Sequence, residues 1–198
     1  MVPDRTRIAR RAGLDVRRSL VRPECTPWSE VTVATPLRTT FDLLLDQPLP
    51  DAVADLDAVL RAGLVTLPQI AAMVQERSDK GIVLAPRAVQ LADPRAESRP
   101  ESRVRVWLAL DGLHPEQQYW IEDSHGRLAR ADLAFPEQKV AVEYDGSWRD
   151  GERWALNRDR DRLTRVQAAG WEIVFVTAQL LHDPARMVRT VRAALERR

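Results

Sequence analysis

The stretch ARADLAFPEQKVAVEYDG, residues 129–146, decides the fold class of this chain. Apolar and polar residues alternate on both sides of the short turn Pro136-Glu137-Gln138. Alternation with period two is typical of strands that bury one face. The stretch therefore predicts two neighbouring strands, Leu128–Phe135 and Lys139–Tyr144, joined by a hairpin turn.

Acidic residues stand in the middle of these two expected strands. In the second strand Val140 and Val142 face one side, and Glu143 and Asp145 face the other, because alternate side chains share a face. The hairpin brings Asp132 of the first strand close to that acidic face. Carboxylates packed together repel, so such a cluster needs compensation. Either a divalent cation or pairing with arginine supplies it, and the arginines nearest in sequence are Arg130, Arg149 and Arg153.

The flanking sequence extends the hairpin into an α-β-β-β-α-β-α order of elements. We expect a helix that opens with the capping box Ser98-Arg99-Pro100-Glu101, then a strand, then the hairpin. A charged helix over about 151–169, a strand over Trp171–Thr177 and a last helix that begins at Asp183 complete the order. Because the last strand is apolar and bounded by helices, we expect it in the middle of a mixed sheet. The predicted class is α/β.

The first half of the chain follows a different pattern. After a short β start it is mainly helical: Thr35-Pro36 marks one helix start, Gly63 a helix end and Thr66 a further start. The pair of helices around Gly63 is more typical of an ordinary hairpin than of a helix-turn-helix, because few basic residues follow it. We therefore predict two regions, a helical one over 1–92 and a second domain over 93–198.

Composition limits the classes of protein. The chain has 198 residues, 44% of them hydrophobic and 30% charged, with a net charge of +1. These values are ordinary for a globular protein, and nucleic-acid binding would have to rely on local patches. The single Cys25 excludes an internal disulfide and a four-cysteine zinc site. A chain with one cysteine is typical of a reducing cytoplasm, which is where we expect it. No apolar run approaches the ~20 residues of a membrane helix, so we expect no membrane contact.

The order of motifs in residues 97–195 resembles the PD-(D/E)xK nuclease core, and more closely the bacterial very-short-patch-repair-like endonuclease-domain family. The shared strings follow each other along the chain. They are Ser98-Arg99-Pro100-Glu101, Gly112-Leu113-His114-Pro115-Glu116-Gln117-Gln118, Asp132-Leu133-Ala134-Phe135-Pro136, Glu143-Tyr144-Asp145-Gly146, Asn157-Arg158-Asp159-Arg160-Asp161-Arg162 and Ala169-Gly170-Trp171-Glu172-Ile173-Val174-Phe175-Val176-Thr177. The resemblance implies a restriction-endonuclease-like core with a mixed central sheet.

The same resemblance implies metal-dependent cleavage of phosphodiester bonds in DNA. Asp132 and Glu143 would hold Mg²⁺ or Mn²⁺, and Glu101 would complete the set of ligands directly or through water. The ion would polarise the phosphoryl group and activate a water. Gln118 could touch that water, and Asp145 stands where many nucleases of this fold keep a lysine. The mid-strand carboxylates favour function over structure, whereas Glu101 fits a capping role equally well.

Basic residues after the third strand are the candidates for DNA contact. Arg149 occupies the place where family members commonly have a histidine, and it can hold a phosphate but cannot transfer protons near neutral pH. Arg153 and Arg158 lie on the charged helix, which either lines a phosphate groove or forms a solvated face with paired charges.

Three functions follow from these patterns. The leading one is a DNA endonuclease in repair, restriction or defence against mobile elements. The second is a catalytically impaired, DNA-associated regulator or antitoxin-like protein, and the third is a protein-interaction module built on the helical first half. Longer members of the family carry a winged-helix segment similar to that of AbiEi-type antitoxins, and we expect this chain to begin after it.

Overall fold

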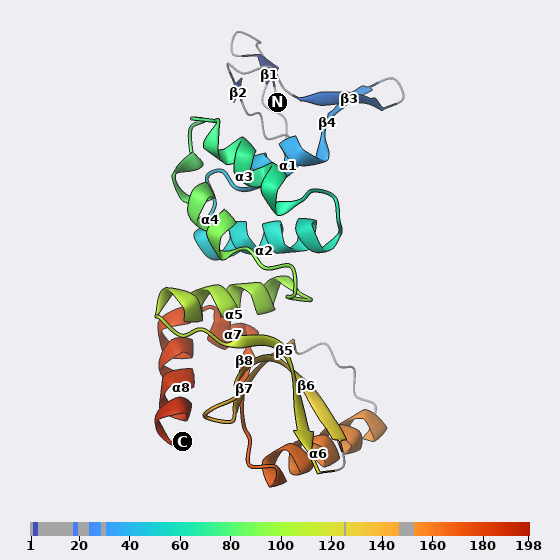
Figure 1. The fold of residues 1–198 in the computed structure, drawn as a ribbon, viewed down its shortest axis with the longest axis vertical. Coiled ribbons are helices and arrows are strands. Elements are labelled where there is room, and N and C mark those ends of the chain that lie inside the picture. The colour runs from blue at the N-terminus through green and yellow to red at the C-terminus, as the bar shows by residue number, and fades with distance from the viewer. Residues whose placement is uncertain (1, 4–17, 20–23, 29–30, 125, 147–152) are drawn as a thin grey trace.

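The computed structural model describes residues 2–3, 18–19, 24–28, 31–124, 126–146 and 153–198. Short strands precede a group of helices in the first half (Figure 1). In chain order the elements are β1 (Val2–Pro3), β2 (Arg18–Ser19), β3 (Cys25–Trp28), β4 (Val31–Ala34), α1 (Pro36–Leu43), α2 (Leu49–Arg61), α3 (Leu67–Gln75), the 3-10 helix η1 (Ile82–Leu84) and α4 (Ala85–Leu91).

The helix ends of this half lie where the sequence places them. Thr35 caps α1, because its side chain accepts a hydrogen bond from the Arg38 backbone N–H at 3.2 Å. Thr66 and Gln69 form a capping box at the start of α3. Gly63 follows α2 with a φ of 66°, a conformation that glycine adopts without steric cost. The predicted caps are confirmed.

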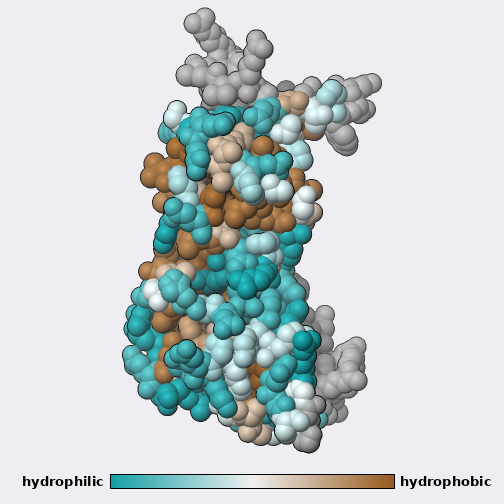
Figure 2. Space-filling view, viewed as in Figure 1, coloured by the Kyte–Doolittle hydropathy of each residue, from teal (hydrophilic) through white to brown (hydrophobic). Residues whose placement is uncertain are grey.

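The helices α1 to α4 enclose an apolar core to which Val106 of α5 also contributes. Its fully buried members include Phe41, Leu44, Leu56, Ile70 and Ala88. Apolar side chains also gather on the surface of this part, as Figure 2 shows on one face. The exposed ones are Leu64, Leu67, Val83 and Leu84. Among the described residues, no helix is both long enough and apolar enough to cross a membrane.

The second half adds a sheet flanked by helices. Its elements are α5 (Arg99–Leu110), β5 (Glu116–Asp123), β6 (Gly126–Phe135), β7 (Val140–Asp145), α6 (Arg153–Ala168), β8 (Glu172–Thr177), α7 (Ala178–Leu181) and α8 (Pro184–Glu196). This is the predicted order with one addition, the four-residue helix α7. The α/β class is confirmed, since β5, β6 and β7 run antiparallel and β7 and β8 run parallel in one mixed sheet.

Helices cover both faces of this sheet. Leu133, Val142 and Val176 belong to the core cluster that includes residues of α5 and α8. Ala141 and Ala131 belong to a second cluster with Val166 of α6. The second half is therefore a layer of strands between α5 and α8 on one side and α6 on the other (Figure 1).

The predicted position of the last strand is wrong. The strand order is β5-β6-β7-β8, so β8 lies at an edge of the sheet and pairs only with β7 among the described strands. Val174 and Val176 are buried under the helices, and Ile173 packs on the opposite cluster. An apolar pattern indicates that both faces of a strand are covered. It does not indicate that both edges of the strand are paired.

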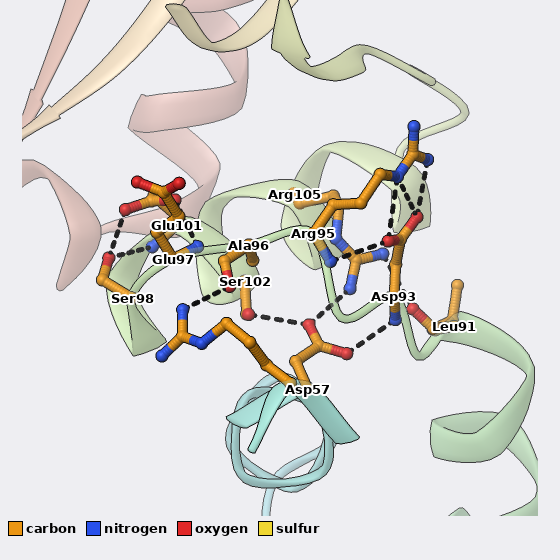
Figure 3. Close-up of polar contacts among 11 residues, drawn as sticks. Asp57, Leu91, Asp93, Arg95, Ala96, Glu97, Ser98, Glu101, Ser102 and Arg105 are labelled. Carbon is orange, nitrogen blue, oxygen red and sulfur yellow. Dashed lines mark hydrogen bonds and ion pairs between the residues drawn. The ribbon is translucent and has the colours of Figure 1, made fainter. Parts of the chain in front are cut away.

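Buried polar contacts join α5 to the helical half (Figure 3). Asp57 of α2 is 1% exposed. It accepts hydrogen bonds from the Ser102 hydroxyl at 2.7 Å, the Arg105 guanidinium at 2.8 Å and the Asp93 backbone N–H at 2.6 Å. Two further ion pairs, Asp55 with Arg99 and Asp51 with Arg103, extend the contact along α2 and α5. These contacts fix the helix that carries Glu101.

Candidate functional site

Asp132 and Glu143 lie where the strands β6 and β7 separate. The last register pair of this ladder in the described chain is Leu133 opposite Val142, so the next two positions are Asp132 and Glu143. Here the Tyr144 backbone N–H donates a hydrogen bond of 2.9 Å to the Asp132 carboxylate. A side chain thus replaces a main-chain acceptor at the position where the ladder ends.

The regular alternation of side chains breaks at the same place. Leu133 packs under α5 and α8, whereas Ala131, two residues earlier, packs beneath α6. The break lies in β6. In the neighbouring strand β5, Gln118 stands opposite it and adopts a φ of 54°. A non-glycine residue with positive φ is strained, and such strain often marks functional sites. From this position the Gln118 side chain reaches Glu101 of α5.

Glu101 serves the helix end and the site together. Its Oε1 accepts a hydrogen bond from the Ser98 hydroxyl at 2.7 Å, and its Oε2 accepts one from the Glu97 backbone N–H at 2.8 Å (Figure 3). The Gln118 side-chain amide donates a third bond of 3.0 Å to Oε2. The capping interpretation and the site interpretation of Glu101 are therefore compatible, because one carboxylate has room for several donors.

The pKa of Asp132 responds to the negative charges of the neighbouring carboxylates. Burial raises the pKa of Asp132 from 3.8 to about 6, against the lowering effect of the hydrogen bond from Tyr144. The negative charges of Glu101, Glu143 and Glu97 raise this pKa as well. Asp132 is thus a half-buried acid in a field of negative charge, which a bound cation would relieve.

Glu143 already has a cationic partner. Both of its carboxylate oxygens accept hydrogen bonds from the Arg162 guanidinium of α6, at 2.9 and 3.0 Å. The sequence predicted that the charged helix, α6, either forms a solvated face or lines a phosphate groove. Arg162 of this helix instead forms an ion pair with the sheet. It reaches back to the sheet and neutralises one of the predicted metal ligands.

The remaining predicted residues are placed as follows. Asp145 ends β7 and is exposed, and no hydrogen bond or ion pair links its side chain to the other carboxylates in the described part of the chain. Arg149 lies outside the described residues. Arg153 and Arg158 belong to the first turns of α6, where only the backbone is described.

Two residues of the site were missed by the sequence patterns. Glu97 precedes the helix cap, acts on Asp132 through its charge and pairs with Arg130 at 2.7 Å. Arg162 is the partner of Glu143 described above. No spacing rule identifies either residue. Glu97 lies in a loop and affects a strand residue far away in the sequence, and Arg162 lies on a helix and pairs with a residue of the sheet.

The residues present fit a hard divalent cation by their chemistry, since carboxylate oxygens are the donors that Mg²⁺ prefers. They do not form a finished cage. Within the described residues, no three His, Cys, Asp or Glu side chains are gathered closely enough to hold a metal ion. The carboxylates are near enough to raise the pKa of Asp132, yet Glu143 is turned to Arg162.

Relatives of this chain are found in Mycobacterium tuberculosis. It is 34% identical over 195 residues to Uncharacterized protein MT2308 of strain CDC 1551 / Oshkosh, an alignment that covers 96% of this chain and 68% of the relative. Identity and coverage are the same for Uncharacterized protein Rv2248 of strain H37Rv. The chain belongs to the family of these two proteins.

No protein-family model and no solved structure matches the chain. The names of the two relatives state no activity, so the chemistry of this family has to be inferred from the site itself.

Proposed function

We propose that this protein is a divalent-metal-dependent DNA endonuclease with a restriction-endonuclease-like core. The observation that carries the proposal is the position of Asp132: it is half-buried where the β6–β7 ladder ends, and the charges of Glu101, Glu143 and Glu97 raise its pKa. Concentrated negative charge without structural need is typical of a site that is completed by a ligand. The motif order of residues 97–195 supports the same reaction.

Each residue of the proposed site has a distinct role. Asp132 and Glu143 would hold Mg²⁺ or Mn²⁺, with Glu101 as the third carboxylate. When bound, such an ion polarises a phosphoryl oxygen and lowers the pKa of a nearby water. Gln118 keeps the Glu101 carboxylate turned toward the sheet through its 3.0 Å hydrogen bond. The Tyr144 backbone N–H fixes the orientation of Asp132.

The experiment is a cleavage assay on purified protein. Plasmid DNA should be nicked or cut with Mn²⁺ or Mg²⁺ and left intact in EDTA. Asp132→Ala should lose at least ~100-fold in rate, because a missing metal ligand removes several kcal/mol of charge stabilisation. Asp111→Ala is the matched control, because Asp111 pairs with Arg192 at the far end of α5. Equal cleavage by wild type and Asp132→Ala would reveal a contaminating nuclease and refute the assignment.

One observation favours a second candidate, a DNA-associated regulator without catalysis. The Arg162–Glu143 pair supplies the arginine compensation that a structural acidic cluster would use. A regulator should bind duplex DNA equally well with and without divalent metal and should never cut it. The nuclease should cut only with metal, so one set of assays separates the two candidates.

A further inference from the structure

We propose that Arg162 is an internal counter-ion that occupies Glu143 in the free protein and exchanges this carboxylate for a DNA phosphate when the substrate binds. The inference rests on the proposed function and adds a step to it. The metal site is completed only when DNA takes Arg162 away from Glu143.

The geometry shows why Arg162 and a cation compete. The two nitrogens Nη1 and Nη2 of Arg162 bind the two oxygens of Glu143 at 2.9 and 3.0 Å. The Glu143 side chain is only 13% exposed, so little of it remains for another ligand. A metal ion needs at least one of the oxygens that the guanidinium now holds.

The three carboxylates of the site are not equivalent in this respect. Glu101 is held by the Ser98 hydroxyl, the Glu97 backbone N–H and the Gln118 amide, all of them neutral donors. Asp132 accepts from the Tyr144 backbone N–H. Within the described chain, Glu143 alone of these three has a cationic partner. Arg162 therefore blocks one metal-binding carboxylate, Glu143, and does not affect the other two.

A phosphate is the group best suited to release Glu143. The planar guanidinium binds phosphate and carboxylate with the same two-pronged geometry. The Arg162 side chain is 26% exposed, so a ligand at the mouth of the site can reach it. Exchange of one oxyanion for another keeps the guanidinium in a two-pronged ion pair of the same kind.

This exchange couples the two ligands. DNA raises the affinity for metal, and metal raises the affinity for DNA by the same factor, as thermodynamic linkage requires. The free protein then binds metal weakly, and a complete site is formed only on substrate.

The first measurement uses Mn²⁺ alone, titrated into the full chain and followed by electron paramagnetic resonance of free Mn²⁺. Arg162→Gln should bind Mn²⁺ at least about tenfold tighter than wild type, which corresponds to about 1.4 kcal/mol. Arg165→Gln is the matched control: it lies one turn further on α6, is exposed and approaches Asp123 only at 3.9 Å. It should bind Mn²⁺ as wild type does.

Arg162→Lys keeps the charge and loses the two-pronged contact, so its Mn²⁺ affinity should lie between those of wild type and Arg162→Gln. This variant also serves if Arg162→Gln does not fold, which circular dichroism will show. A Mn²⁺ affinity that is unchanged or weaker in both Arg162 variants overturns the proposal while the metal site itself stands. Absence of Mn²⁺ binding in every protein, wild type included, overturns the proposed function and this inference together.

The second measurement tests the phosphate. A fluorescein-labelled random-sequence duplex is bound in EDTA, where no cleavage occurs, at several salt concentrations. Arg162→Gln should bind several-fold more weakly than wild type, and its slope of log affinity against log salt should fall by about one. Arg165→Gln should keep the wild-type slope. An unchanged slope in Arg162→Gln overturns the exchange, because it shows that Arg162 never contacts a phosphate.

Discussion

Asp57 belongs to α2 and Asp132 to β6, two elements that lie on opposite sides of α5 (Figure 1), and the two carboxylates have opposite surroundings. Asp57 is held by the Ser102 hydroxyl and the Arg105 guanidinium. Asp132 accepts from the Tyr144 backbone N–H and faces the negative charges of Glu101, Glu143 and Glu97. Burial raises the pKa of both, but Arg105 and Ser102 counteract the rise at Asp57.

The contrast teaches that one helix contributes to a stabilising contact on one face and to the proposed site on the other. Ser102 points to Asp57, and its neighbour Glu101 points to the sheet. Asp57 meets a hydroxyl and a cation, and this contact joins two parts of the molecule. Asp132 lies near other carboxylates, which is an unfavourable arrangement and is expected of a site retained for function.

The largest expected effect comes from breaking the Asp57 contact. Asp57→Ala leaves Arg105, which is 8% exposed, without its carboxylate, and removal of one partner of a buried pair costs about 3–5 kcal/mol. The melting temperature should fall by at least ~6 °C in a chain of this size. Thermal unfolding by circular dichroism measures it. Asp93→Ala is the control, because its partner Arg95 is exposed and the loss should be small.

The second prediction concerns the proposed metal ion. Mn²⁺ in hundredfold excess over its dissociation constant should stabilise wild type by ~2.7 kcal/mol, because the ion binds only the folded chain. Asp132→Asn should gain little. Differential scanning fluorimetry with Mn²⁺, and again after removal by EDTA, measures both. A wild type whose melting does not respond to Mn²⁺ at any concentration would argue against a metal site.

The third prediction removes the repulsion at Asp132. A pKa raised from 3.8 to about 6 corresponds to ~3 kcal/mol, which solvent around a half-buried group reduces to about 1–2 kcal/mol. Asp132→Asn keeps an oxygen for the Tyr144 N–H and should therefore melt ~2–8 °C higher than wild type in EDTA. A variant that melts lower would show that Asp132 has a stabilising partner.

The pH dependence sharpens the same comparison. Because the pKa of Asp132 is higher in the folded chain than in the unfolded chain, folding favours its protonated form. Stability contributed by this proton is present near pH 4 and is lost as the pH rises through about 6. The advantage of Asp132→Asn should therefore vanish near pH 4 and be complete above about pH 7. Melting curves of both proteins across this range test the direction.

The smallest expected effect concerns Arg149. If Arg149 clamps a phosphate, Arg149→Ala should weaken DNA binding a few-fold and reduce the salt slope by about one, without a new step in the pH profile. Arg149→His should raise activity, since imidazole transfers protons near pH 7. If neither variant changes binding or turnover, Arg149 is an ordinary surface residue.

Local patterns predicted the elements and their ends well. The caps at Thr35, Thr66 and Ser98 depend on side chains that bond to their own helix, so a few neighbouring residues contain the whole interaction. The hairpin of β6 and β7 follows from alternation in the same way. The position of β8 at the sheet edge did not follow, because alternation reports covered faces and contains no information about edge partners.

By itself, the sequence determined which carboxylates stand in mid-strand, that Glu101 caps a helix, and that Asp132 and Glu143 meet across a hairpin. Only the tertiary structure decided which charges these groups face. Arg162 reaches Glu143 from a helix on the sheet's other layer, and Glu97 approaches Asp132 from a loop. Both interactions, one an ion pair and one a charge effect, join residues far apart in the chain. They depend on how the layers pack rather than on any local period.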